Sequence, residues 1–129
     1  DSHKAEMVTK VILTTHDLSL AGQQSIAGVG FRPQAIIIFA TVSGAAGKAS
    51  WGFSDSTINL VISDFANAGA AGSYRMLAPY TVCIQDSIEN STLASVQSFD
   101  ANGLTLNWEK TGTGATGNVD IAILALSHY

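Results

Sequence analysis

The sequence predicts an all-β fold, an antiparallel β-sandwich in a single domain, and three observations lead to that prediction. Short apolar and β-branched runs alternate with turn residues along the whole chain. No long window keeps the periodicity of an amphipathic helix. Residues 93–110 have the pattern of a strand, a tight turn and a second strand, in which Leu104, Leu106 and Trp108 alternate with polar residues. We therefore expect two packed antiparallel sheets, with a closed barrel as the alternative.

The expected strands follow one another closely. They are residues 8–15, 23–27, 34–43, 49–54, 57–62, 73–77, 81–85, 93–99, 104–110 and 119–127. The first is rich in β-branched residues, which favour strands. Two of them, 34–43 and 119–127, are apolar on both faces. This pattern predicts central strands that are buried from both sides, and it favours a sandwich over a barrel.

The connections carry turn residues. Two glycines and a proline within residues 28–33 predict a corner, and Asp55-Ser56 predicts a turn. Asn102-Gly103 supplies residues that accept positive φ, which a short hairpin connection needs. Residues 66–72 are small and of low complexity, so we expect a loop there, or a short helical turn that its glycines weaken.

Length and composition limit the classes of protein. A chain of 129 residues is one domain by size, and 47% hydrophobic residues exclude a disordered chain. We assign residues 7–129 to the domain and interpret residues 1–6 as a tag remnant or flexible N-terminus. Charged residues make up 12%, about half of the roughly 25% of ordinary domains. We therefore expect much of the surface to be interface between copies, and a secreted or thermally robust domain is the alternative.

The charge balance also limits the partners. The net charge is −4, and the six Lys and Arg residues form no basic run, so we expect no nucleic acid partner. No stretch approaches the roughly 18 apolar residues of a membrane-spanning helix, so we expect no membrane insertion.

The residues that carry chemistry are scattered. Cys83 is the only cysteine and lies in an apolar strand pattern, which predicts a buried, inert thiol. His16 precedes Asp17, and we interpret it as an exposed loop residue, with a general base as the alternative. The acidic residues mostly fall at predicted turns. Asp55 and Asp64 would be the acids of a calcium site, but no EF-hand-like spacing supports one. We expect no enzyme, and no catalytic, metal or cofactor residues.

The aromatic residues are the candidates for binding. Trp108 lies on the apolar face of its strand and is expected in the core. The candidate ligand or interface residues are Trp51, Phe53, Tyr74, Arg75 and Tyr80. Aromatic rings stack on sugars, and Tyr, Trp and Arg are also frequent anchors of protein interfaces, so both roles stay open.

Four segments carry a family resemblance. Residues 28–37, GVGFRPQAII, resemble an opening motif of many tailed-phage virion proteins, and residues 51–54, WGFS, resemble the segment that often follows it. Residues 98–108, SFDANGLTLNW, are similar to the hairpin signature of the same proteins, with Leu104 in place of the more usual aromatic residue. The closing strand 119–126 fits the pattern, and the resemblance covers roughly residues 24–127.

The same layout is similar to H-type lectin domains, which are small antiparallel, jelly-roll-like sandwiches that form trimers. The resemblance implies a non-enzymatic structural protein on the exterior of a phage virion, in capsid decoration or in a tail-fibre module. It implies a homotrimer that contacts the major capsid or tail protein. The alternative is a carbohydrate-binding, lectin-like module for receptor recognition, with a glycan as ligand. No sugar-binding residue of the lectins can be matched to a position of this chain.

Overall fold

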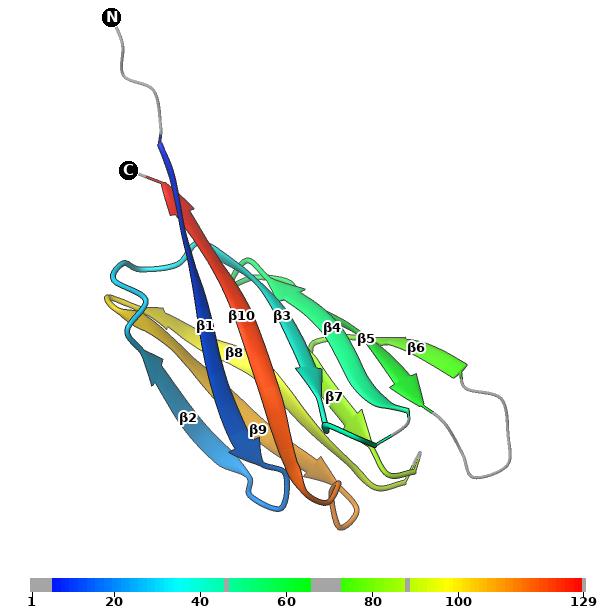
Figure 1. Ribbon diagram of the computed structural model, residues 1–129. Helices are drawn as coiled ribbons and strands as arrows, with labels where there is room; N and C mark the ends of the chain where they lie inside the picture. The colour runs from blue at the N-terminus through cyan, green and yellow to red at the C-terminus, as the bar shows by residue number, and fades with distance from the viewer. Residues whose placement is uncertain (1–5, 46, 66–72, 88, 129) are drawn as a thin grey trace, which may run out of the picture.

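The protein is a sandwich of two antiparallel sheets (Figure 1). The computed structural model describes residues 6–45, 47–65, 73–87 and 89–128, and the segments 1–5 and 66–72 discussed above lie outside these residues. A six-stranded sheet has the order β1 (Met7–Asp17), β10 (Asn118–His128), β3 (Ala35–Thr41), β4 (Lys48–Ser54), β5 (Asn59–Phe65) and β6 (Ser73–Leu77). A four-stranded sheet has the order β2 (Gly22–Ala27), β9 (Gly103–Thr111), β8 (Ser91–Asp100) and β7 (Val82–Gln85). The predicted all-β sandwich is confirmed.

The core lies between the two sheets and is formed by alternate residues of each strand. Ile36 and Ile38 of β3 face the four-stranded sheet, where Leu106 and Trp108 of β9 are also fully buried. The alternation of residues 104–108 is therefore confirmed: Leu104, Leu106 and Trp108 all point into the core. Trp108 is a core residue, as expected.

The edge strand β7 packs against small residues of β4 and β5. The Cys83 N–H donates a hydrogen bond to Ser50 Oγ (3.4 Å), and Ser63 Oγ donates to the Cys83 carbonyl (2.8 Å). A Cβ atom at Gly52 would overlap the Thr81 carbonyl oxygen. Small and hydroxyl side chains on this face of β4 and β5 therefore let the backbone of the second sheet approach closely and satisfy part of its edge.

The turn between β8 and β9 corrects one prediction. Neither Asn102 nor Gly103 has a positive φ, so the expected reason for this pair was wrong. Gly103 is required because a Cβ there would overlap the carbonyl oxygen of Ile26 on β2. Asn102 fixes the neighbouring corner: its side-chain oxygen accepts a hydrogen bond from Gly30 N (2.7 Å), and its carbonyl accepts one from Val29 N (3.1 Å).

The two strands that are apolar on both faces also depart from expectation. β3 and β10 are central in the six-stranded sheet, but the four-stranded sheet covers only one of their faces. On the other face of β3, Ile37 and Phe39 are exposed, and Phe39 is 51% accessible. The prediction that these strands are buried from both sides is therefore wrong for the single chain. The sequence pattern correctly indicated that both faces of these strands are apolar. It does not indicate whether the same chain or another molecule covers the second face.

Candidate interaction surface on the six-stranded sheet

We call the side of the six-stranded sheet that points away from the four-stranded sheet the outer face. The apolar character of this face is clearest in β4, where Trp51 and Phe53 point outward and are exposed. The alternate residues Ser50, Gly52 and Ser54 point inward and are buried. The small residues inside are explained by the close approach of β7. The large aromatic residues outside have no covering layer among the described residues, which reverses the usual polar exterior of an antiparallel sheet.

The strand register extends this apolar surface across the sheet. Residues that are paired from strand to strand lie in rows on the outer face. One row is Val11, Leu124, Ile37, Phe53 and Leu60. The next row is Leu13, Ala122, Phe39, Trp51, Ile62 and Met76. Both rows are apolar along their whole length, so together they form one continuous apolar patch on the outer face.

The patch is large for a monomer. Every large hydrophobic side chain that is exposed in the described chain lies on the outer face, except Leu20 and Ile58. The four aromatic rings of the face are 41–68% exposed, which at roughly 200 Å² for each aromatic side chain leaves about 400 Å² of aromatic surface open. The aliphatic side chains add an area of the same order. The largest apolar patch of a typical monomer is about 300–600 Å², and larger ones mark interaction sites.

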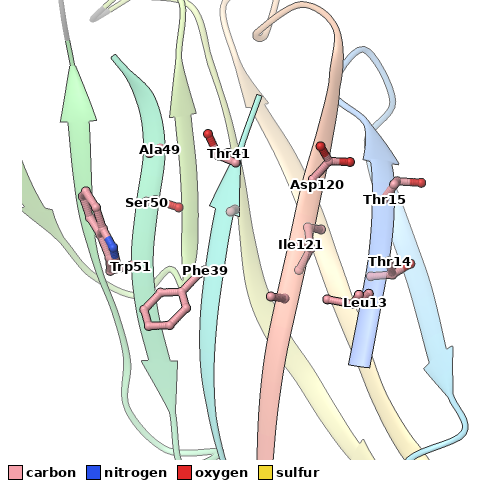
Figure 2. Close-up of a pocket in the computed structure, with 12 residues that line it drawn as sticks. Leu13, Thr14, Thr15, Phe39, Thr41, Ala49, Ser50, Trp51, Asp120 and Ile121 are labelled. Carbon is pink, nitrogen blue, oxygen red and sulfur yellow. The ribbon is translucent and has the colours of Figure 1, made fainter. Parts of the chain in front are cut away.

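Two hollows lie in the outer face. The larger has a volume of about 580 Å³; Leu13, Phe39 and Trp51 lie around it, and Asp120 and Thr41 lie toward one end (Figure 2). The smaller, of about 320 Å³, lies against Phe53 and Leu60. The surface is therefore uneven, with aromatic ridges beside depressions that side chains of another molecule can fill.

Charge is confined to one end of the outer face. Register places Asp120 of β10 and Asp64 of β5 in the same row, next to the larger hollow, and the strands contribute no Lys or Arg to this face among the described residues. The opposite surface of the molecule is different. There the four-stranded sheet shows Gln23, Ser25 and Asn107 to solvent. The two exteriors thus have opposite character, and only one has the composition of an interface.

The structure brings together three of the five candidate residues. Trp51, Phe53 and Tyr74 lie on the outer face, and the rings of Trp51 and Tyr74 are 6.2 Å apart at 48°. Arg75 points to the other side of β6, where its Nη1 is 3.4 Å from Gln85 Oε1. Tyr80 lies elsewhere.

The Tyr80 hydroxyl donates a hydrogen bond to Glu109 Oε2 (2.9 Å), which raises the pKa of Tyr80, and its ring packs on a small cluster with Val61 and Leu93. Both Arg75 and Tyr80 thus have partners inside the chain.

Several residues of the outer face were not among the candidates. They are Leu13, Ile37, Phe39, Ile62 and Met76. The two-sided apolar pattern of residues 34–43 is the signal that could have found Ile37 and Phe39. It was interpreted as burial from both sides within the chain.

His16 lies in β1 and is half-buried, so its interpretation as an exposed loop residue was wrong. Its ring stacks on Trp108, with centroids 3.9 Å apart and an interplanar angle of 5°. Its Nε2 donates a hydrogen bond to the Leu20 carbonyl (2.9 Å). Burial lowers the pKa of His16, which keeps the ring neutral on the indole. This arrangement closes the side of the sandwich between β1 and β9.

The other reactive groups are held apart. Cys83 is buried, and burial raises the pKa of its thiol. Asp55 and Asp64 lie at opposite ends of the β4–β5 hairpin, so the calcium pair considered above does not form. Asp55 instead accepts hydrogen bonds from the Thr57 and Ile58 N–H groups, as an Asx turn does. Among the described residues, no three His, Cys, Asp or Glu side chains gather as a metal site would need.

Comparisons with protein-family models, with curated proteins and with solved structures found no match. The part of the chain that the structure describes holds no helix of the length and apolarity that a membrane crossing requires.

Proposed function

We propose that this chain is a non-enzymatic structural protein on the exterior of a phage virion, which assembles as a homotrimer and binds the major capsid or tail protein. The observation that carries the proposal is the uncovered apolar outer face of the six-stranded sheet. The resemblance of residues 28–37 and 98–108 to tailed-phage virion proteins supports the biological setting.

Self-association follows from the composition of the face. The two rows described above contain only apolar residues. A partner with a strongly charged surface would lose its hydration on these rows and find no charge there to pair with. A second copy brings the same apolar surface and similar hollows. Standard interfaces bury about 800 Å² per partner, which is the order of the exposed apolar area here.

The oligomeric state tests the proposal directly. In sedimentation velocity over a series of concentrations, the wild-type chain is expected to sediment as a trimer. Trp51→Lys places an ammonium group in the centre of the outer face and should stay folded but no longer form the trimer. Ser25→Lys adds the same charge to the outer surface of the four-stranded sheet and should remain a trimer. A wild-type chain that stays monomeric at high concentration would exclude the proposal.

Binding to a particle tests the second part. The trimer should co-sediment with shells of the phage that lack this protein, and bound shells should resist heat better than bare ones. The Ser25→Lys trimer serves as the positive control for assembly. If neither shells nor tails capture the trimer, the virion role is wrong even if the oligomer is right.

A carbohydrate-binding module is the second candidate, and one observation favours it. The larger hollow combines the aromatic rings of Phe39 and Trp51 with the Asp120 carboxylate, which are the groups that stack on sugar rings and accept hydrogen bonds from hydroxyls. A clear signal on a glycan array that is lost in Trp51→Ala or Tyr74→Ala would favour this function. No signal, together with binding to shells, would favour decoration.

A further inference from the structure

We infer that the free edge of β1 is a second contact between copies, in which β1 strands of two chains pair antiparallel around a two-fold axis. The contact uses the edge of the six-stranded sheet and not its outer face. It therefore does not rest on the proposed trimer.

Of the four sheet edges, β1 is the long one. β2, β6 and β7 have 6, 5 and 4 residues, whereas β1 has 11. Short edge strands are a common protection against unwanted pairing, and the edge of β7 is further covered by Ser50 and Ser63. β1 contains no proline, and it pairs with β10 through consecutive residues without a bulge. It therefore lacks most of the devices that prevent strand addition.

One hydrogen bond shows which backbone groups face outward. The Thr15 carbonyl accepts a hydrogen bond from Gln24 Nε2 (2.9 Å), a side chain of β2, so it points away from β10. Because N–H and C=O groups of alternate residues point to the same side of a strand, those of Met7, Thr9, Val11 and Leu13 also point to the free edge. Within the described residues, no backbone or side-chain partner reaches these four residues on that side.

β1 and its neighbour β10 extend together beyond β3. β3 pairs with β10 only as far as Leu126, whereas β1 and β10 continue to the pairs Val8–Ser127 and Met7–His128. The two strands therefore project together at the end of the sandwich where both termini lie (Figure 1). A two-stranded ribbon is marginal alone, and a third strand along its free edge would stabilise it.

A second copy of β1 fits this edge because an edge strand complements itself under a two-fold axis. The register centred on Val11 places Val11 opposite Val11 of the second copy and Thr9 opposite Leu13. It uses all the outward-facing groups except the Thr15 carbonyl, which Gln24 already occupies, and the Met7 N–H that would donate to it. The register centred on Lys10 would place two ammonium groups side by side, which is unfavourable.

Pairing in this register also joins the two apolar outer faces. The backbone N–H and C=O groups that point to the free edge belong to the odd-numbered residues of β1, and so do the side chains on the outer face. The two six-stranded sheets would become one continuous sheet, with Val11 and Leu13 extending their apolar rows into the next copy. Together with the proposed trimer, a two-fold contact of this kind would link trimers into an open layer, and that consequence alone rests on the proposed function.

Cysteine cross-linking tests the register. In the proposed pairing the two Val11 Cα atoms lie about 5.5 Å apart, within the range of a disulfide. The two Leu13 Cα atoms are displaced by about four residues along the strand, roughly 13 Å, which a disulfide cannot span. Val11→Cys is therefore expected to form a disulfide-linked dimer under mild oxidation, and Leu13→Cys is not. Leu13 is the more exposed of the two, at 78% against 62%, so random collision would favour the control.

Three further measurements complete the test. Thr9→Cys mixed with Leu13→Cys should form a linked heterodimer, because these positions face each other. The Val11→Cys link should persist when Trp51→Lys is added, since that change disrupts only the outer face. The wild-type chain, whose Cys83 is 1% exposed, should not cross-link. Equal linking of the Val11 and Leu13 variants, or linking of neither, would overturn the inference.

Discussion

Replacing Phe39 with serine tests the role of the outer face of the six-stranded sheet separately from that of its inner face, which belongs to the core. Phe39 is 51% exposed in the single chain, so about 100 Å² of its surface is left for an interface, at roughly 200 Å² for the whole side chain. At about 25 cal/mol per Å², burying it stabilises the assembly by roughly 2.5 kcal/mol for each copy. Phe39→Ser should therefore weaken association by about two orders of magnitude per copy.

The neighbouring residue provides the control. Ile38 is fully buried on the inner face of the same strand. Ile38→Ser removes core packing and buries a hydroxyl, which should cost about 4 kcal/mol of the free energy of unfolding. Phe39→Ser should change that free energy, measured on the dilute monomer, by only about 0.5 kcal/mol.

Sedimentation equilibrium measures the association, and urea unfolding at a concentration below the dissociation constant measures the monomer. The dilution is needed because association by itself raises the apparent stability of the folded chain. The reasoning fails if Phe39→Ser associates like the wild type. It also fails if Phe39→Ser destabilises the dilute monomer as strongly as Ile38→Ser does, because Phe39 would then belong to the core.

Three further predictions concern the fold. Gly52→Ala should cost about 3 kcal/mol or more, or roughly 10 °C in Tm, because the added methyl group overlaps the Thr81 carbonyl; calorimetry measures it, and an unchanged Tm would contradict the close approach. The folded-state pKa of His16 lies below its unfolded value of about 6.5, so stability should be full above that pH and fall as the pH drops through it toward the folded pKa. His16→Phe should flatten the dependence of Tm on pH in this window, and an unaltered profile would exclude His16 as its source. Asn102→Ala should cost about 1–2 kcal/mol, because it removes the acceptor of the Gly30 N–H, and faster amide exchange at Gly30 should accompany the loss.

The strands could be predicted from the sequence because their periodicity is local. The hairpin of residues 93–110 was placed correctly, since apolar residues at alternate positions have only one way to reach a core. The reason for Gly103 could not be predicted, because the atom that excludes a side chain there belongs to Ile26, a distant residue. His16 was misplaced for a similar reason, since the indole of Trp108 that covers it comes from the other sheet.

The candidate site was predicted only in part. Trp51 and Phe53 were selected because they are aromatic, and both lie on the outer face. Arg75 was selected beside Tyr74, but adjacent residues of a strand point to opposite faces, so the two could not share one surface. Phe39 was overlooked because its strand is apolar on both sides. An interior position and an interface position carry the same residue types, and only the arrangement of the layers separates them.

The position of the two carboxylates makes the arrangement of the trimer testable. Asp64 and Asp120 lie at the same end of the outer face, and no cation of the described strands shares that face. If the strands of three copies run parallel to the three-fold axis, all their carboxylates gather at one end and repel one another. Added salt screens such charges within about 8–10 Å at ordinary ionic strength, so it should tighten the trimer. Asp64→Asn with Asp120→Asn should tighten it at low salt and remove most of that dependence. An assembly that salt leaves unchanged would instead have strands that lie across the three-fold axis, with the carboxylates of each copy far from those of the next.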